Sequence, residues 1–275
     1  MGSVFSPYYA LARRRGGGTA DPENHCAINV ALYGQGGRWA MTERGRGSIV
    51  RERDRFVVGP SELAWDGTGL TIRFDEVCAP VPKRARGVIR VTPGPLLDRA
   101  FAIDGEGRHE WRPVSPACRV EVECEAPAMA WRGDGYLDLN EGAEPLEAAF
   151  RSWTWGAAPL GDGAAILYDV ERRAGGPLSL GLKVDAAGAL SSFEPPPLSR
   201  LAPPFWRAPR AAWRDEGASP RVVATLEDAP FYARSRVATR LLGEDVVMMH
   251  EGLSLDRFRL PVVQAMLPFR MPRRA

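Results

Sequence analysis

Short segments in which apolar and polar residues alternate follow one another along most of the chain, separated by Gly, Pro and Asp. Such alternation is typical of half-buried β-strands, because successive side chains of a strand point to opposite faces of the sheet. In RVEVECE (119–125), Val120, Val122 and Cys124 share one face, whereas an arginine and glutamates share the other. This segment predicts a sheet with one solvated side. The other strands predicted in the first half lie at residues 26–33, 38–44, 70–77 and 88–91.

A second series of strands is predicted in the other half of the chain, at residues 164–173, 178–185, 221–228, 231–242 and 246–253. Between the two series, EPLEAAFRSWTW (144–155) is the one stretch with modest helical character. The proline-rich segment 193–206 predicts a fixed, non-helical loop or edge segment. Many short strands with few helices predict an all-β fold of the barrel or sandwich type. We place a domain boundary near residues 143–160.

Composition and charge narrow the class of protein. The 275 residues include 36 basic and 34 acidic side chains, and a net charge of +2 argues against nucleic-acid binding. No run approaches the roughly 18–20 apolar residues of a membrane span, and the N-terminal charges follow the apolar residues, the reverse of a signal peptide. Without C-x-x-C spacing, Cys26, Cys78, Cys118 and Cys124 are expected to be reduced thiols in the cytosol. We expect a protein that is soluble or at most peripheral to a membrane.

Motifs for metal, nucleophilic and nucleotide chemistry are missing from the sequence. His25, His109 and His250 lie far apart without H-x-x-x-H or H-x-H spacing. A three-histidine metal site is therefore not favoured, although a barrel can bring distant strands together. The chain contains no G-x-S-x-G, G-x-G-x-x-G or G-x-x-x-x-G-K segment. We expect no metal and no cofactor.

Two pairs of residues spaced i and i+2 are the candidates for chemistry: His109 with Trp111, and Tyr136 with Asp138. On strands, each pair would present a polar group beside an aromatic one on a single face. The alternative is structural. Trp111 and Tyr136 would then be core residues, His109 would bond a backbone carbonyl, and Asp138 would cap a turn with Asn140. Composition alone favours this alternative.

Longer motifs change that balance. Six segments of the chain resemble motifs of the carotenoid 1,2-hydratases, or hydroxyneurosporene synthases, of phototrophic bacteria. These segments are GSVFSPYYALARRR, ADPENHCAINVALYG, HEWRPVSP, GYLDLNEGAEPLEAAFRSWTW, LEDAPFYARSRV and MMHEGLSLDRF. The resemblance runs from residue 2 to the C-terminus. It implies two lipocalin-like β-barrels, residues 1–145 and 146–275. It also implies cofactor-free addition of water to the terminal C1–C2 double bond of acyclic carotenoids such as neurosporene and lycopene, giving a tertiary 1-hydroxy product.

The resemblance also implies the site residues: His109, Trp111, Tyr136 and Asp138, with the aspartate as proton donor. An alkene is a very weak base, so the acid must keep its proton near neutral pH, whereas a free aspartic acid has a pKa of about 3.9. Burial in an apolar pocket raises such pKa values by about 3–5 units. Trp111 and Tyr136 would face the forming cation. His109 would orient Asp138 or hold the attacking water.

The expected substrate is dissolved in a membrane, so peripheral contact with the inner, photosynthetic membrane from the cytoplasm is expected. Residues 258–275 mix apolar residues with arginines and would touch lipid; the alternative is a last strand followed by a basic tail. Relatives usually carry an aromatic-rich strand segment ahead of GSVFSP, so the first barrel is expected to be incomplete at its start. They also tend to have Asp where this chain has Thr154.

Two other functions stay open at this stage. One is a non-catalytic, lipocalin-like isoprenoid-binding protein, which needs no protonated acid. The other is a cofactor-free cyclase or isomerase on the same fold, and residue types alone do not separate hydration from cyclisation.

Overall fold

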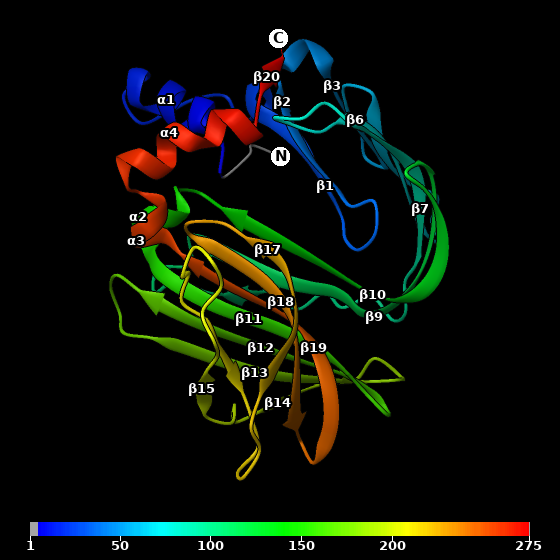
Figure 1. The fold of residues 1–275 in the computed structure, drawn as a ribbon, viewed down its shortest axis with the longest axis vertical. Helices are drawn as coiled ribbons and strands as arrows, with labels where there is room; N and C mark the ends of the chain where they lie inside the picture. The colour runs from blue at the N-terminus through cyan, green and yellow to red at the C-terminus, as the bar shows by residue number, and fades with distance from the viewer. Residues whose placement is uncertain (1–4, 275) are drawn as a thin grey trace. The chain divides into compact units, whose positions relative to one another are not determined.

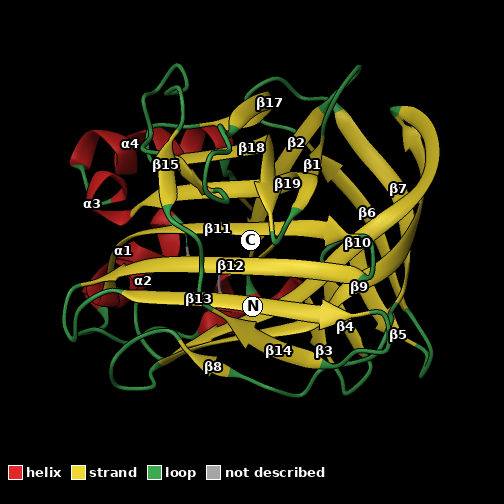
Figure 2. Cartoon of the chain, turned by 90° about the horizontal axis from the view of Figure 1, so that it is seen from below, coloured by secondary structure: helices red, strands yellow, loops and turns green. Residues whose placement is uncertain are grey.

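β-Strands are the main secondary structure, as Figures 1 and 2 show, and they confirm the all-β fold class. The computed structural model describes residues 5–274. This part of the chain forms two compact units, each made of segments that are separate in sequence. Unit 1 comprises the chain up to Pro93, Arg119–Asp134 and the chain from Gln264; unit 2 comprises Gly94–Cys118 and Gly135–Val263.

The units differ from the expected contiguous domains, residues 1–145 and 146–275. The long strands β9 (His109–Ala126) and β10 (Ala128–Gly142) each have one part in unit 1 and the other in unit 2. With 18 residues, β9 is about three times as long as a common strand, so its two ends pack in different surroundings. The domain limits and the closure of each sheet into a lipocalin-like barrel stay predictions.

Unit 1 is built from an N-terminal helix and antiparallel strands. Its complete elements are α1 (Pro7–Arg15), η1 (Pro22–His25), β1 (Cys26–Leu32), β2 (Arg38–Arg44), η2 (Arg46–Ser48), β3 (Ile49–Arg51), β4 (Arg55–Val58), β5 (Ser61–Trp65), β6 (Leu70–Val77), β7 (Arg84–Thr92) and β20 (Arg273–Arg274). β1, β2 and β20 form one sheet. β10, β9, β7, β6, β5, β4 and β3 follow one another in a second sheet, in which β8 (Phe101–Ala102) also pairs with β9. The strands predicted at 26–33, 38–44 and 70–77 are confirmed as β1, β2 and β6. Those at 88–91 and 119–125 lie within β7 and β9.

The alternation in RVEVECE places its apolar face in the core of unit 1. Val122 and Cys124 are buried and pack with Val30, Phe74 and Ala85. The glutamates of the opposite face are wholly or partly exposed, so the predicted one-sided strand is confirmed.

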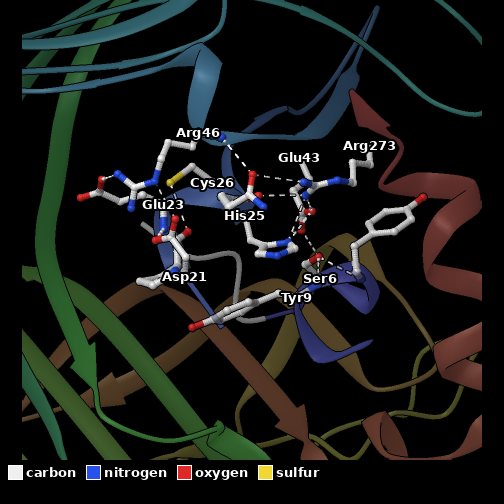
Figure 3. Close-up of polar contacts among 12 residues, drawn as sticks. Ser6, Tyr9, Asp21, Glu23, His25, Cys26, Glu43, Arg46 and Arg273 are labelled. Carbon is white, nitrogen blue, oxygen red and sulfur yellow. Dashed lines mark hydrogen bonds and ion pairs between the residues drawn. The ribbon is translucent and has the colours of Figure 1, made fainter. Parts of the chain in front are cut away.

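A buried carboxylate, Glu43 of β2, joins distant parts of unit 1 (Figure 3). Its Oε2 accepts a hydrogen bond from Ser6, which also caps α1 by accepting from the backbone N–H groups of Tyr8 and Tyr9. Its Oε1 lies 2.9 Å from His25 Nδ1 and accepts from the Arg273 guanidinium. These contacts hold α1, η1 and β20 to one strand.

The next residue of β2, Arg44, points to the opposite face and makes a second buried ion pair. Its Nη1 and Nη2 donate to Oε1 and Oε2 of Glu76 at 3.1 and 2.8 Å. Ser61 Oγ donates to Glu76 Oε1 at 2.6 Å. Both faces of β2 are therefore buried at this end, and each carries a charge whose partner is supplied by another strand.

Unit 2 contains a seven-stranded sheet, which we call the large sheet, and one face of this sheet meets the site. Its complete elements are β8 (Phe101–Ala102), α2 (Leu146–Ala149), β11 (Phe150–Leu160), β12 (Gly163–Arg172), β13 (Leu178–Asp185), β14 (Leu190–Phe193), β15 (Leu198–Arg200), β16 (Ala211–Trp213), β17 (Arg221–Asp228), β18 (Tyr232–Leu241), β19 (Glu244–Ser254) and α3 (Leu255–Phe258). The sheet order is β14-β13-β12-β11-β19-β18-β17, and β15 pairs with β16. The second series of predicted strands is confirmed as β12, β13, β17, β18 and β19.

One face of the large sheet is packed as a hydrophobic core. Ala158, Leu167, Val237 and Met248 point to this face and surround Trp213, which is fully buried. The segment 193–206 supplies Leu201 and β15 beside this core, which agrees with the predicted loop or edge segment. This face stabilises the sheet and leaves the opposite face for the site.

Two predictions of secondary structure need correction. Within 144–155, only Leu146–Ala149 is helical, and Phe150 starts β11, because its aromatic residues pair with strands on both sides. A last strand at 258–275 is wrong for most of that segment: Pro261–Arg270 is helix α4, followed by the short strand β20. The helical spacing of its buried residues, Val263 and Leu267, explains the helix.

We predict that Glu43→Ala lowers the free energy of unfolding by about 3–5 kcal/mol, because it leaves the partly buried guanidinium of Arg273 and the buried hydroxyl of Ser6 without their acceptor. Urea denaturation followed by tryptophan fluorescence measures the change. Glu125→Ala is the matched control, because it removes an exposed ion pair in which Arg86 Nε lies 3.4 Å from the carboxylate. This substitution should lower the free energy of unfolding by about 0–1 kcal/mol. Equal denaturation midpoints for the two variants would contradict the prediction.

Candidate active site

Three of the four residues singled out from the sequence meet in unit 2. Trp111 lies on β9, and Tyr136 and Asp138 lie on β10. The indole Nε1–H of Trp111 donates to Asp138 Oδ2 at 2.9 Å, and the Tyr136 hydroxyl donates to the same oxygen at 3.4 Å. Both expected i, i+2 pairs therefore lie on strands. The alternative in which Asp138 caps a turn does not fit its place within β10.

His109 lies on the same face of β9 as Trp111 but does not reach the carboxyl. Its imidazole is buried edge-on against Phe150, with ring centroids 4.9 Å apart. Its Nε2 is 3.8 Å from Glu144 Oε1 and has no hydrogen-bond partner among the described residues. Burial lowers the pKa of His109, so the ring is neutral near neutral pH. Its surroundings fit neither a backbone-bonded histidine nor a direct partner of Asp138.

The face of the large sheet opposite the hydrophobic core carries further polar and aromatic residues. Trp155 of β11 pairs with Tyr168 of β12 and with Glu251 of β19, and Glu251 pairs with Arg234 of β18. Directly paired residues on neighbouring strands point to the same face. These four side chains therefore form a row across adjacent strands, which we call the site row. Figure 2 shows β11 and β12 side by side.

Ring contacts join the site row to the residues found from the sequence. Tyr136 packs edge-on against Trp155, with ring centroids 4.9 Å apart. Trp111 packs edge-on against Tyr168 at 5.4 Å. Further contacts extend this aromatic surface through Phe101, Trp153 and Phe150. Asp138 is thus a partly buried acid bounded by indole and phenol rings.

Burial is the main influence on the acidity of Asp138. It raises the pKa of this carboxyl, and the negative charge of Glu251 adds to the rise. The hydrogen bonds from Trp111 and Tyr136 act in the opposite direction because they favour the ionised form, as does the positive charge of Arg234. The net direction is upward, which favours a protonated carboxyl.

The phenols of the site stay neutral. Burial raises the pKa of Tyr136 well above its usual value, and the charge of Asp138 raises it further, against the nearby indole N–H groups of Trp111 and Trp155. Burial likewise raises the pKa of Tyr168. Tyr136 therefore acts as a hydrogen-bond donor toward the carboxyl and not as an anion.

Other chemistries have little support within residues 5–274. No group of three or more His, Cys, Asp or Glu in this part of the chain is arranged to hold a metal ion. His25 is engaged by Glu43, and His250 Nε2 lies 2.7 Å from the Ala211 carbonyl oxygen. The four cysteines form no disulfide. Among the described helices, none is long and apolar enough to cross a membrane.

Four residues of the site were not predicted from the sequence: Trp155, Tyr168, Glu251 and Arg234. Trp155 had a signal, because it follows Trp153 at i+2 in a strand and so shares its face. Thr154, between them, points to the other face of the sheet and pairs with Asp169. No sequence pattern pointed to Glu251 or Arg234, because the site residues near them lie on strands far away in the sequence.

Such a site is suited to donating a proton to a weak base. A carboxyl group whose pKa is raised keeps its proton at higher pH than a free one, and aromatic faces stabilise a nearby positive charge. The arrangement offers a carboxyl group with a raised pKa, neutral phenol hydroxyls and a largely apolar aromatic surface.

Comparison with solved structures supports the fold alone. A crystal structure of a protein described as a candidate AttH from Nitrosomonas europaea matches with a TM-score of 0.58 and 12% identity, covering 79% of this chain and 76% of that one. At this identity the likeness says nothing about activity.

Sequence relatives are far more similar. The acyclic carotenoid 1,2-hydratase of Thiocapsa roseopersicina is 55% identical over 275 residues, covering 99% of this chain and 67% of that protein. Those of Rubrivivax gelatinosus and Cereibacter sphaeroides are 48% and 44% identical; each match covers 100% of this chain, and 68% and 96% of the relative. The family model for carotenoid hydratase CrtC matches residues 1–275. The chain therefore belongs to the carotenoid hydratase CrtC family.

Proposed function

We propose that this chain adds water across the terminal C1–C2 double bond of acyclic carotenoids such as neurosporene and lycopene, without a cofactor. Membership of a hydratase family supports the reaction class. The observation that carries the mechanism is the position of the Asp138 carboxyl, which Trp111 and Tyr136 hold against an aromatic surface where burial raises its pKa. The carboxyl supplies the acid that the reaction requires.

The reaction begins with the protonated carboxyl of Asp138, which gives its proton to C2 of the polyene end. The π electrons of the C1–C2 bond form the new C2–H bond and leave a tertiary cation at C1. The rings of Trp111 and Tyr136 face this cation, and such attraction reaches about 2 kcal/mol once water is excluded. A water oxygen then bonds to C1, and the surplus proton returns to the Asp138 carboxylate, which restores the acid.

Tyr136 and His109 have different parts in this proposal. The Tyr136 hydroxyl, 3.4 Å from Asp138 Oδ2, lies beside the carboxyl and holds the attacking water. His109 is a positioning residue, because its neutral ring packs against Phe150 and lies beside Trp111 on one strand face. It keeps that end of β9 in place without adding a charge.

We predict that Asp138→Asn lowers turnover of lycopene or neurosporene by at least about 100-fold, since an amide cannot supply the proton. The assay follows product by mass, where hydration adds one water and cyclisation adds nothing. Asp134→Asn, on an exposed position of the same strand, is the matched control and should leave turnover unchanged. Unchanged turnover in Asp138→Asn would remove the carboxyl from the mechanism, and carotenoid binding without product in the native chain would favour a binding protein.

We predict that Asp138→Asn is increasingly more stable than the native chain as pH rises. The folded-state pKa of Asp138 is raised above the unfolded value of about 3.9. Its contribution to stability is therefore complete below about pH 4 and is lost as pH rises through the folded pKa. Asp138→Asn lacks this loss, so its melting temperature should exceed that of the native chain increasingly across this window. A difference in melting temperature that does not depend on pH would contradict the raised pKa.

We also propose that the protein contacts the inner, photosynthetic membrane from the cytoplasmic side through α4. The substrate is dissolved in lipid, and the solvent side of α4 is apolar: Val262 and Phe269 are 64% and 70% exposed, with exposed Met266 between them. These residues, spaced i, i+4 and i+7, form one stripe on the helix.

The charges around α4 suit an anionic lipid surface. Residues 257–275 contain five arginines and no Asp or Glu. Apolar side chains that enter the headgroup region, together with basic residues attracted to anionic lipids, are typical of peripheral membrane binding. The proposed membrane contact is limited to the exposed stripe of α4 and does not include all of residues 258–275. Met271 is buried, and Arg273 binds Glu43.

We predict that Val262→Gln/Met266→Gln/Phe269→Gln reduces flotation with anionic phosphatidylglycerol vesicles several-fold, because it removes the apolar stripe and keeps every charge. The matched control changes exposed apolar residues elsewhere: Val81→Gln/Leu96→Gln/Val223→Gln. Added salt should weaken binding of the native chain. Equal flotation of both triple variants would exclude α4 as the contact.

A further inference from the structure

The site row contains a second carboxylate that the proposed mechanism does not use. Glu251 of β19 pairs with Trp155, whose ring packs on Tyr136, so it shares the face of the sheet that meets the site. Its side chain is only 20% exposed. An acid in this position needs a partner, because burying an isolated carboxylate is costly.

Arg234 is that partner. Its Nε donates to Glu251 Oε1 at 2.8 Å, and its Nη2 makes a second contact with the same oxygen. Nη1 of Arg234 is 3.7 Å from Oε1 of Glu227, on β17. The guanidinium is thus placed between two carboxylates, and its ion pair holds Glu251 in a fixed position.

The groups that surround Asp138 differ in charge. Trp111 carries no charge. Tyr136, Tyr168 and Tyr232, which lies beside Glu251, are neutral because burial raises the pKa of each phenol. Glu251 and Arg234 are the charged groups that act on Asp138, with Glu227 beyond Arg234, and the effect of Glu251 is the larger. Like charge disfavours ionisation of a neighbouring acid.

We propose that Glu251, fixed by Arg234, is a positioning residue whose negative charge keeps Asp138 protonated. The inference rests on the proposed function, because it assigns Glu251 to the same reaction. Glu251 touches neither the proton in transfer nor the substrate. It acts on Asp138 from a strand of the other sheet, β19, which carries none of the four residues found from the sequence.

The test compares the pH dependence of turnover in the native chain and in Glu251→Gln. Activity needs protonated Asp138, so it falls as pH rises through the pKa of this group. Without the like charge that pKa is lower, and the alkaline loss of activity should move to lower pH. Turnover at neutral pH should fall several-fold, whereas the acid plateau should keep its native value.

Two further variants separate charge from structure. Asp245→Asn removes one negative charge from an exposed position of the same strand and should leave the profile unmoved. Arg234→Gln/Glu251→Gln replaces the ion pair with a neutral pair that can still hydrogen-bond. Because Glu251 acts more strongly on Asp138 than Arg234 does, the double variant should show a smaller shift in the same direction. It also provides the test if Glu251→Gln alone fails to fold.

A second readout does not need the substrate. The carboxylic-acid infrared band that disappears in Asp138→Asn reports directly on the protonation of this group, and its titration should move to lower pH in Glu251→Gln. An unmoved titration, or a profile equal to that of the native chain, would overturn the role of Glu251. A moved titration in a chain that forms no hydrated product would leave this role intact and reject the proposed function.

Discussion

The site depends on the hydrogen bond from the Trp111 indole to Asp138 Oδ2. This bond holds a partly buried carboxyl against an aromatic surface, and it opposes the burial that raises the pKa of the same group. An acid that is only buried would hold its proton too tightly to release it to an alkene. An acid that is only hydrogen-bonded would be ionised. In the proposed mechanism, this balance lets the group both keep a proton and give it away.

A β-sheet with two different faces makes this balance compatible with stability. On the large sheet, one face packs Trp213, Leu167 and Met248 into a conventional core. The other face presents the site row. Because neighbouring residues of a strand point to opposite sides, polar groups can be placed on one face without weakening the packing of the other. The buried carboxylates of unit 1, Glu43 and Glu76, have a different part, since each is fully partnered and joins segments of the chain.

Likeness of fold and likeness of sequence carry different information here. The protein from Nitrosomonas europaea shares the fold at 12% identity, and folds of this kind host many unrelated functions. The relatives at 41–55% identity are all named acyclic carotenoid 1,2-hydratases. The four residues that the resemblance implied are present, and the structure brings three of them within hydrogen-bond reach of one another. The fourth, His109, packs against Phe150 and makes no hydrogen bond to Asp138.

The sequence by itself determined many of the strands, because period-two alternation is a local property: the ends of β2, β6, β13 and β17 agree with the pattern, whereas β11 begins in a segment with helical character. It also determined which residues share a face, since i and i+2 on one strand must do so. Only the tertiary structure decided that the compact units are discontinuous, that 261–270 is a helix, and that Glu251 and Arg234 face the site. The physical reason is that strand register and packing depend on residues far apart in the chain. No local pattern records which distant side chains will be opposite one another.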